Sequence, residues 1–187
     1  DWDEQLIRQL GYPRRLFQEI RMPGYELGSL RGEIRKEVGF SCKVVLPPTH
    51  DTASAVAAVP TQEEETLYIS SGTWSLMGTE RMAARAHNMT NEGGYDCRFR
   101  YLKNIMGLWM IQSVRKESAP ELGFGEICAR AAKETITSRI DVNDARFLAP
   151  KNMTEEVRRA CREAGEQVPQ TIGELAAVIY HSLAQCY

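Results

Sequence analysis

The chain has 187 residues, of which 43% are hydrophobic and 26% are charged, and its formal net charge is −2. This composition is ordinary for a globular protein with a buried core, and the interspersed charges argue against the basic face of a nucleic-acid-binding surface. No apolar run approaches the roughly 20 residues of a membrane span, and no signal peptide begins the chain. We therefore expect neither nucleic acid nor a membrane as a partner.

The cysteines are scattered and odd in number, with no Cys-x-x-Cys pair: Cys42, Cys97, Cys128, Cys161 and Cys186. This usage indicates reduced thiols in a cytoplasmic protein rather than a disulfide scaffold or a metal site. The chain has no initiator Met, and its last apolar stretch stops without Gly, Pro or a polar tail. We therefore expect an excised piece of a longer protein, with apolar faces left open in residues 1–40 and 171–187.

The first part of the chain predicts short helices separated by Gly and Pro. Apolar spacing favours a helix over residues 2–10, and residues 13–30 are expected to be irregular. A charged helix over 30–38 is followed by a β-branched run at 43–46, which predicts a buried strand closed by two prolines. A helix of small side chains over 53–59 and a surface turn at 60–65 complete this part.

Strands dominate the middle of the chain, and helices its end. Residues 66–79 predict a β-hairpin, residues 81–89 a loop and residues 95–102 a strand, while Asn91-Glu92-Gly93-Gly94 is a strong turn signal. Further helices are predicted over 104–114, with Asn104 at the capping position, and over 123–133, 154–164 and 171–187. The last begins with a capping-box pattern. We expect Trp74, Met106 and Trp109 in the core. Strands alternating with helices predict an α/β fold.

Two clusters of small polar residues lie at strand ends, where α/β proteins place their sites. One holds His50, Asp51 and Thr52, just past the strand at 43–46. The other is the turn at 70–73, where Gly72 permits a positive φ and backbone N–H groups suit a phosphate. The residues are equally compatible with a helix-capping Asp and an ordinary hairpin.

Well-known nucleotide and hydrolase motifs are missing from the chain. It contains no phosphate-binding loop of the Gly-x-x-x-x-Gly-Lys-Ser/Thr type and no Gly-x-Ser-x-Gly nucleophile elbow. No second loop exists to make an aspartic-protease dyad with Asp51.

Several longer motifs resemble the FGGY family of carbohydrate kinases, in the order found in its rhamnulokinase subfamily. They are THDTASAV (49–56), SSGTWSLMG (70–78), NEGG (91–94) and LKNIMGLW (102–109), with FLAP (147–150) and SLA (182–184) beyond them. The resemblance covers nearly the whole chain. It implies an actin-like ATPase or ribonuclease H-like fold with two lobes. This chain would contain only part of each lobe. Residues 1–48 would end the sugar-binding lobe, and residues 49–187 would begin the nucleotide-binding lobe.

The resemblance also implies a reaction and a set of site residues. It implies transfer of phosphate from ATP, with Mg²⁺, to a deoxyketose such as L-rhamnulose, with Asp51 as the base that accepts the sugar's proton. His50, Thr52 and Asn104 would contact the sugar, while Gly72, Thr73 and Gln112 would contact ATP. Asn104 and Gln112 would then lie on one helix. No metal-ligating residue and no obligatory protein partner is expected.

Alternatives remain open at each level. Without the resemblance, Asn104 is equally a plain helix cap, Gln112 a surface residue and His50 a structural turn residue. The resemblance is also compatible with L-fuculose or another ketose as the sugar. A non-catalytic sugar-binding or assembly module of actin-like fold is the alternative from another class. The first phosphate hairpin and the adenosine segment of the family are absent from the chain, so we expect the piece alone to be inactive.

Overall fold

The structure is a computed structural model that describes residues 2–61, 63, 66–85 and 89–187. It divides into two compact units. The first comprises Asp1–Glu64, Glu80–Ala84 and Glu92–Arg100, and the second Glu65–Thr79, Arg85–Asn91 and Tyr101–Tyr187. Parts of the turn predicted at 60–65 and of the loop predicted at 81–89 lie outside the described residues. The lobe boundary predicted after residue 48 remains a prediction.

The first two helices of the first unit have ends that local chemistry explains. Helix α1 (Glu4–Gln9) is capped by Asp3, whose carboxylate accepts a hydrogen bond of 2.8 Å from the Leu6 N–H. Helix α2 (Gly32–Val38) ends at Gly39, whose φ of 78° is the left-handed conformation that glycine adopts without a Cβ penalty. Both predicted helices are confirmed, and a short 3₁₀ turn, Arg14–Leu16, lies between them.

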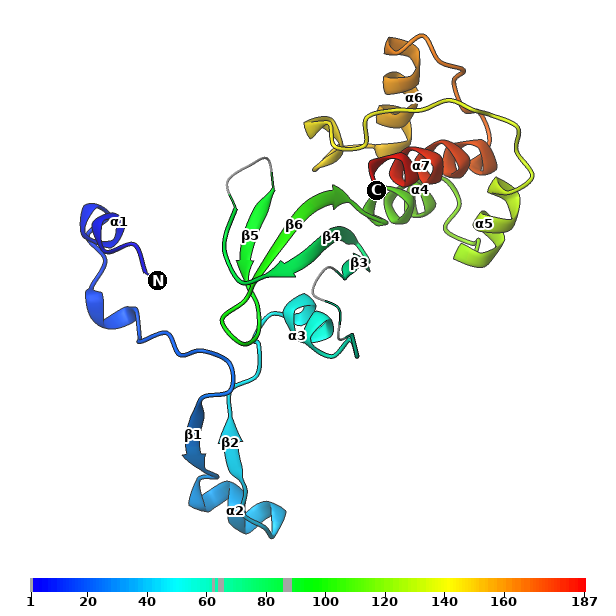
Figure 1. Cartoon of the computed structure of the whole chain (residues 1–187). Coiled ribbons are helices and arrows are strands. Elements are labelled where there is room, and N and C mark those ends of the chain that lie inside the picture. Colours follow the sequence, from blue (N-terminus) through cyan, green and yellow to red (C-terminus); the bar gives the residue numbers. More distant parts are fainter. Residues whose placement is uncertain (1, 62, 64–65, 86–88) are drawn as a thin grey trace. The chain divides into compact units, whose positions relative to one another are not determined.

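An antiparallel pair of strands carries α2 at one end (Figure 1). Strands β1 (Glu26–Ser29) and β2 (Lys43–Val45) form this two-stranded sheet. The prediction of a buried strand at 43–46 is wrong on burial, because Val45 is 50% exposed. The prediction of an irregular 13–30 segment missed β1, since its residues alternate too weakly to signal a strand. Helix α3 (Asp51–Ala57) follows β2.

The remaining strands form one sheet in the order β3-β4-β6-β5. Strands β3 (Leu67–Ser71) and β4 (Trp74–Arg81) are the predicted hairpin, in antiparallel register with Ser71 opposite Ser75. Strand β5 (Thr90–Gly93) replaces the turn predicted at 91–94. The turn follows this strand, at Asp96 and Cys97, which adopt positive φ. Neither Gly93 nor Gly94 has a positive φ.

Strand β6 (Phe99–Met106) and helix α4 (Trp109–Ser118) correct the helix predicted over 104–114. The apolar run at 105–111 is compatible with the hydrophobic period of a helix or of a strand. In the structure Ile105 and Met106 are buried as the last residues of a strand. Gly107 ends it. Asn104 is therefore a strand residue and not a helix cap.

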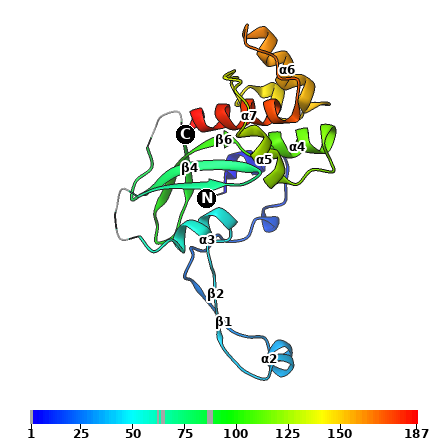
Figure 2. The same ribbon diagram turned by 90° about the vertical axis from the view of Figure 1, so that its right-hand side faces the viewer.

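Four helices pack together at the end of the second unit (Figures 1 and 2). Helices α5 (Phe124–Ala131), α6 (Met153–Glu163) and α7 (Ile172–Cys186) join α4, with α7 against both α4 and α5 and α6 against α4. A 3₁₀ turn, Ala145–Phe147, precedes α6. The capping box predicted at Thr171 is present, with its hydroxyl bound to the Glu174 N–H and the Glu174 carboxylate bound to the Thr171 N–H.

The hydrophobic core of this unit is formed by all four helices and the segment between α5 and α6. Its fully buried members include Met110, Ile127, Phe147, Val157 and Ile179. Most of α7 is buried in this core, so the open apolar face expected for residues 171–187 is wrong: the neighbouring helices already cover it. Within the described residues, no helix combines the length and apolarity needed to cross a membrane.

Candidate functional site

The β3–β4 turn is attached to the start of α4 by two backbone hydrogen bonds. The Gly72 carbonyl accepts from the Leu108 N–H at 2.8 Å, and the Thr73 carbonyl accepts from the Trp109 N–H at 3.0 Å. A Cβ at Gly107 would lie 2.5 Å from the Thr73 carbonyl oxygen, so only glycine permits this approach. The turn and the helix are thus positioned as one structural piece.

Within the turn, Gly72 does not use the positive φ that glycine permits. Its φ is not positive, and a Cβ there would meet only the Trp74 carbonyl oxygen at an ordinary 3.5 Å. The Gly72 N–H closes the turn by donating to the Trp74 carbonyl at 3.0 Å. Thr73 is exposed at the tip of the hairpin, where its side chain is available to a ligand.

The predicted residues Asn104 and Gln112 lie on different elements. Asn104 is exposed on β6, next to the buried Ile105, whereas Gln112 is half-buried on α4. The expectation that one helix carries both is wrong. Gln112 lies one turn into the helix on which the Thr73 turn rests, so the structure brings these two predicted ATP contacts to one region.

Asp51, His50 and Thr52 lie together at the start of α3, in the first unit. The Asp51 side chain is 95% exposed, and its Oδ1 accepts a hydrogen bond of 2.7 Å from the Thr52 N–H. His50 Nδ1 lies 3.4 Å from the same oxygen. Oδ2 has no hydrogen-bond partner among the described residues, and such a carboxylate oxygen can accept a proton from a bound hydroxyl.

A groove runs along one face of α4 and has a volume of about 440 Å³. Trp109, Gln112, Ser113 and Lys116 line it at helical spacings of three, four and seven residues. The Pro150–Lys151 segment forms another part of its lining. Lys116 and Lys151 are not among the site residues predicted from the sequence. The polar stripe on α4 was readable from its spacing, but the approach of Lys151 was not.

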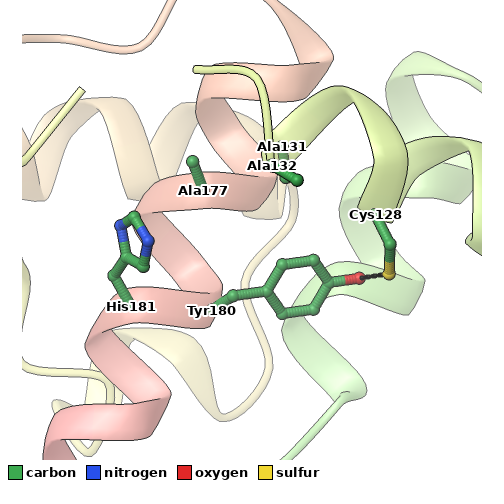
Figure 3. A pocket seen from close by; sticks show the side chains of 6 residues that line it. All are labelled: Cys128, Ala131, Ala132, Ala177, Tyr180 and His181. Carbon is green, nitrogen blue, oxygen red and sulfur yellow. Dashed lines mark hydrogen bonds between the residues drawn. The ribbon is translucent and has the colours of Figure 1, made fainter. Parts of the chain in front are cut away.

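A smaller cavity of about 260 Å³ lies between α5 and α7 (Figure 3). Its lining is mostly apolar, and the Tyr180 hydroxyl lies 3.3 Å from the Cys128 sulfur. Burial, followed by the bond to Cys128, raises the pKa of Tyr180 above its ordinary value. None of the predicted site residues lines this cavity.

The described residues include no group of three or more His, Cys, Asp or Glu side chains that could hold a metal ion. Mg²⁺ in phosphate-transfer enzymes commonly keeps several waters and is held by substrate phosphates with one or two carboxylates. That mode of binding needs no dedicated protein cage among the described residues.

Comparison with known proteins places the whole chain beside sugar kinases. No family model matches it. Rhamnulokinases from Halalkalibacterium halodurans and Oceanobacillus iheyensis are each 47% identical over 192 residues, covering 100% of this chain and 41% of their own. Rhamnulokinase from Bacillus subtilis is 40% identical, covering 99% of this chain and 40% of its own. The chain thus spans about two-fifths of the length of these relatives.

A solved structure resembles the fold. The crystal structure of xylulose kinase from Rhodospirillum rubrum matches with a TM-score of 0.67 and 15% identity, over 98% of this chain and 38% of that chain. This likeness confirms the α/β fold predicted from the sequence, which the chain shares with that xylulose kinase.

Proposed function

We propose that this chain, which is related over its whole length to rhamnulokinases of the FGGY carbohydrate kinases, supplies the catalytic base and a phosphate-binding turn to an ATP-dependent ketose kinase. The observation that carries the proposal is the 47% identity maintained over 100% of the chain. The attachment of the Thr73 turn to α4 supports it, because phosphoryl transfer depends on rigidly placed groups.

Asp51 is the base of the proposed reaction. The sugar hydroxyl oxygen forms a bond to the γ-phosphorus, the bond from that phosphorus to the β,γ-bridging oxygen breaks, and ADP leaves with the electron pair. The hydroxyl proton passes to the Asp51 carboxylate, whose Oδ2 has no other described partner. His50 and Thr52, next to Asp51, would hold the sugar, together with Asn104.

ATP is held on the second unit in this proposal. The Thr73 hydroxyl and the turn around Gly72 would contact its phosphates, and Gln112 would contact the nucleotide further along α4. Mg²⁺, when bound with ATP, neutralises charge on the phosphates.

L-Rhamnulose, phosphorylated at O1, is the proposed sugar because the relatives at 40–47% identity are rhamnulokinases. L-Fuculose or another ketose is the nearest alternative, and a sugar-binding module without catalysis is the alternative from another class. A cytoplasmic location remains a prediction from the scattered cysteines.

A coupled assay of ADP release tests the proposal on a protein that contains this chain with its flanking sequence. We expect ATP consumption that requires L-rhamnulose. ATP consumption with L-fuculose but not with L-rhamnulose would identify L-fuculose as the substrate instead. Sugar binding without ATP consumption would overturn the proposed kinase activity and favour a non-catalytic sugar-binding module.

A further inference from the structure

We propose that Lys116 and Lys151 bind the nucleotide's phosphates in the α4 groove, as an extension of the Thr73 turn. This inference rests on the proposed kinase function and adds two cationic contacts to the ATP site. Residues 116 and 151 are 35 positions apart in the sequence, and they meet in one groove because residues 150–151 return to the face of α4 that carries Gln112.

Trp109 connects the groove to the turn. Trp109 lines the groove, and its backbone N–H binds the Thr73 carbonyl at 3.0 Å. Lys116 lies seven residues further, about 10 Å along the helix at 1.5 Å per residue. Side chains on a helix lean toward its N-terminus, so the Lys116 side chain is directed back toward the turn. Phosphates bound at Thr73 would therefore lie on the side toward which Lys116 reaches.

Charge in the groove favours an anion. Both lysines are exposed, and neither forms an ion pair with a described residue. The acidic residue of the lining, Glu117, is engaged elsewhere: its carboxylate accepts bonds of 2.8 Å from the Met153 N–H and 2.9 Å from the Thr154 N–H. It also accepts from the Thr154 hydroxyl at 2.9 Å. The carboxylate is thus directed to the start of α6, and the ammonium groups are left to bind an external anion.

The form of the groove suits a small organic anion rather than a bare phosphate. Its volume of about 440 Å³ is within the usual range of ligand pockets. Trp109 contributes apolar surface, because its indole N–H is already bound to the Phe147 carbonyl at 3.1 Å. Gln112 adds an amide that can donate or accept. An apolar wall, an amide and two cations together fit a nucleotide.

Displacement of a fluorescent ATP analogue tests the proposal in a protein that contains this chain with its flanking sequence. Each of Lys116→Ala and Lys151→Ala should weaken ATP binding roughly 10-fold or more, the effect of a lost charge-assisted hydrogen bond. The affinity for adenosine, which has no phosphate, should stay within about twofold, as should KM for the sugar. Lys116→Arg should restore most of the ATP affinity. Lys133→Ala, an exposed lysine beyond α5, is the matched control and should change nothing.

The outcomes separate this inference from the proposed function. Unchanged ATP affinity in both alanine variants of a kinase that consumes ATP would overturn the lysine contacts and leave the kinase standing. Equal loss of ATP and adenosine affinity would also overturn them, since it indicates a change of groove shape. A wild-type protein that binds no ATP would overturn both proposals. If the alanine variants melt at lower temperature, Lys→Gln variants at the same positions replace them.

Discussion

The Thr73 carbonyl accepts a 3.0 Å hydrogen bond from the Trp109 N–H. The Gly72 carbonyl likewise accepts from the Leu108 N–H. The two bonds satisfy two of the N–H groups that otherwise have no partner at the start of a helix. The start of α4 is therefore capped by the turn rather than open to phosphate. A phosphate at this point must be met by side chains and by the exposed part of the turn, which gives the Thr73 hydroxyl and the groove lysines their importance.

Gly107→Ala should loosen this attachment. The new Cβ would lie 2.5 Å from the Thr73 carbonyl and 2.6 Å from the Gly72 carbonyl, and relieving such overpacking costs about 1–3 kcal/mol. We expect a lower urea midpoint and weaker ATP binding together. Gly125→Ala is the control, since a Cβ there meets nothing within 4 Å and helix propensity favours Ala by up to about 1 kcal/mol. Equal stability of the two variants would contradict the close packing of the turn on α4.

Thr73→Val should impair the use of ATP and leave sugar binding unchanged. It keeps the branched shape and removes only the hydroxyl, which forms no hydrogen bond within the described part of the chain. A lost hydrogen bond to a charged group costs about 1.5–3 kcal/mol, so kcat/KM for ATP should fall roughly 10- to 150-fold, with sugar binding and melting temperature unchanged. Loss of sugar affinity with ATP affinity intact would show that the turn faces the sugar. Gly72→Val should be mild in folding, because a Cβ fits there at 3.5 Å.

Asp51→Asn should remove the proposed base and little else. The amide oxygen can still accept the Thr52 N–H that Asp51 Oδ1 accepts at 2.7 Å, so α3 should keep its start. Loss of a general base typically lowers the rate about 10²- to 10⁴-fold. We expect kcat to fall by that factor while ATP affinity is retained. Near-normal turnover would exclude Asp51 as the base.

Glu92→Gln should destabilise the first unit through a buried partner. Arg100 is only 2% exposed, and its Nη2 lies 2.7 Å from Glu92 Oε2. Breaking a buried ion pair costs about 3–5 kcal/mol, and we expect the low end because the Glu92 side chain is 32% exposed.

Two comparisons in urea unfolding check that assignment. Glu92→Gln with Arg100→Met should be less destabilised than Glu92→Gln alone, since the unpaired charge is gone. Glu26→Gln removes an exposed pair with Lys43 and should cost at most about 1 kcal/mol. A similar cost for Glu26→Gln and Glu92→Gln would refute the role of burial.

The 187-residue chain should self-associate through its first unit. Large apolar side chains stand exposed along it, including Leu10 at 56%, Leu16 at 64% and Phe40 at 58%, and such surfaces favour association. Sedimentation velocity should show species heavier than the 21.1 kDa monomer, and Leu10→Glu with Leu16→Glu should reduce them. A monomeric, cooperatively melting chain would contradict this expectation.

Local chemistry made several elements predictable. Gly39 stops α2, the Thr171–Glu174 box begins α7, and the 66–79 hairpin is confirmed because its cues lie within a few residues of one another. The order of the motifs along the chain likewise indicated a sugar-kinase family, since that order is a property of the sequence and does not depend on how the elements pack.

Tertiary contacts decided what local cues left open. The run around Asn104 suits a helix or a strand, and only the burial of its neighbours selects β6. Trp74, expected in the core, is 52% exposed, because hydrophobicity alone does not say which face of a strand is covered. Lys116 and Lys151 form one groove only because the chain folds back over 35 residues. No periodicity encodes a meeting over that separation, since it arises from the packing of whole elements.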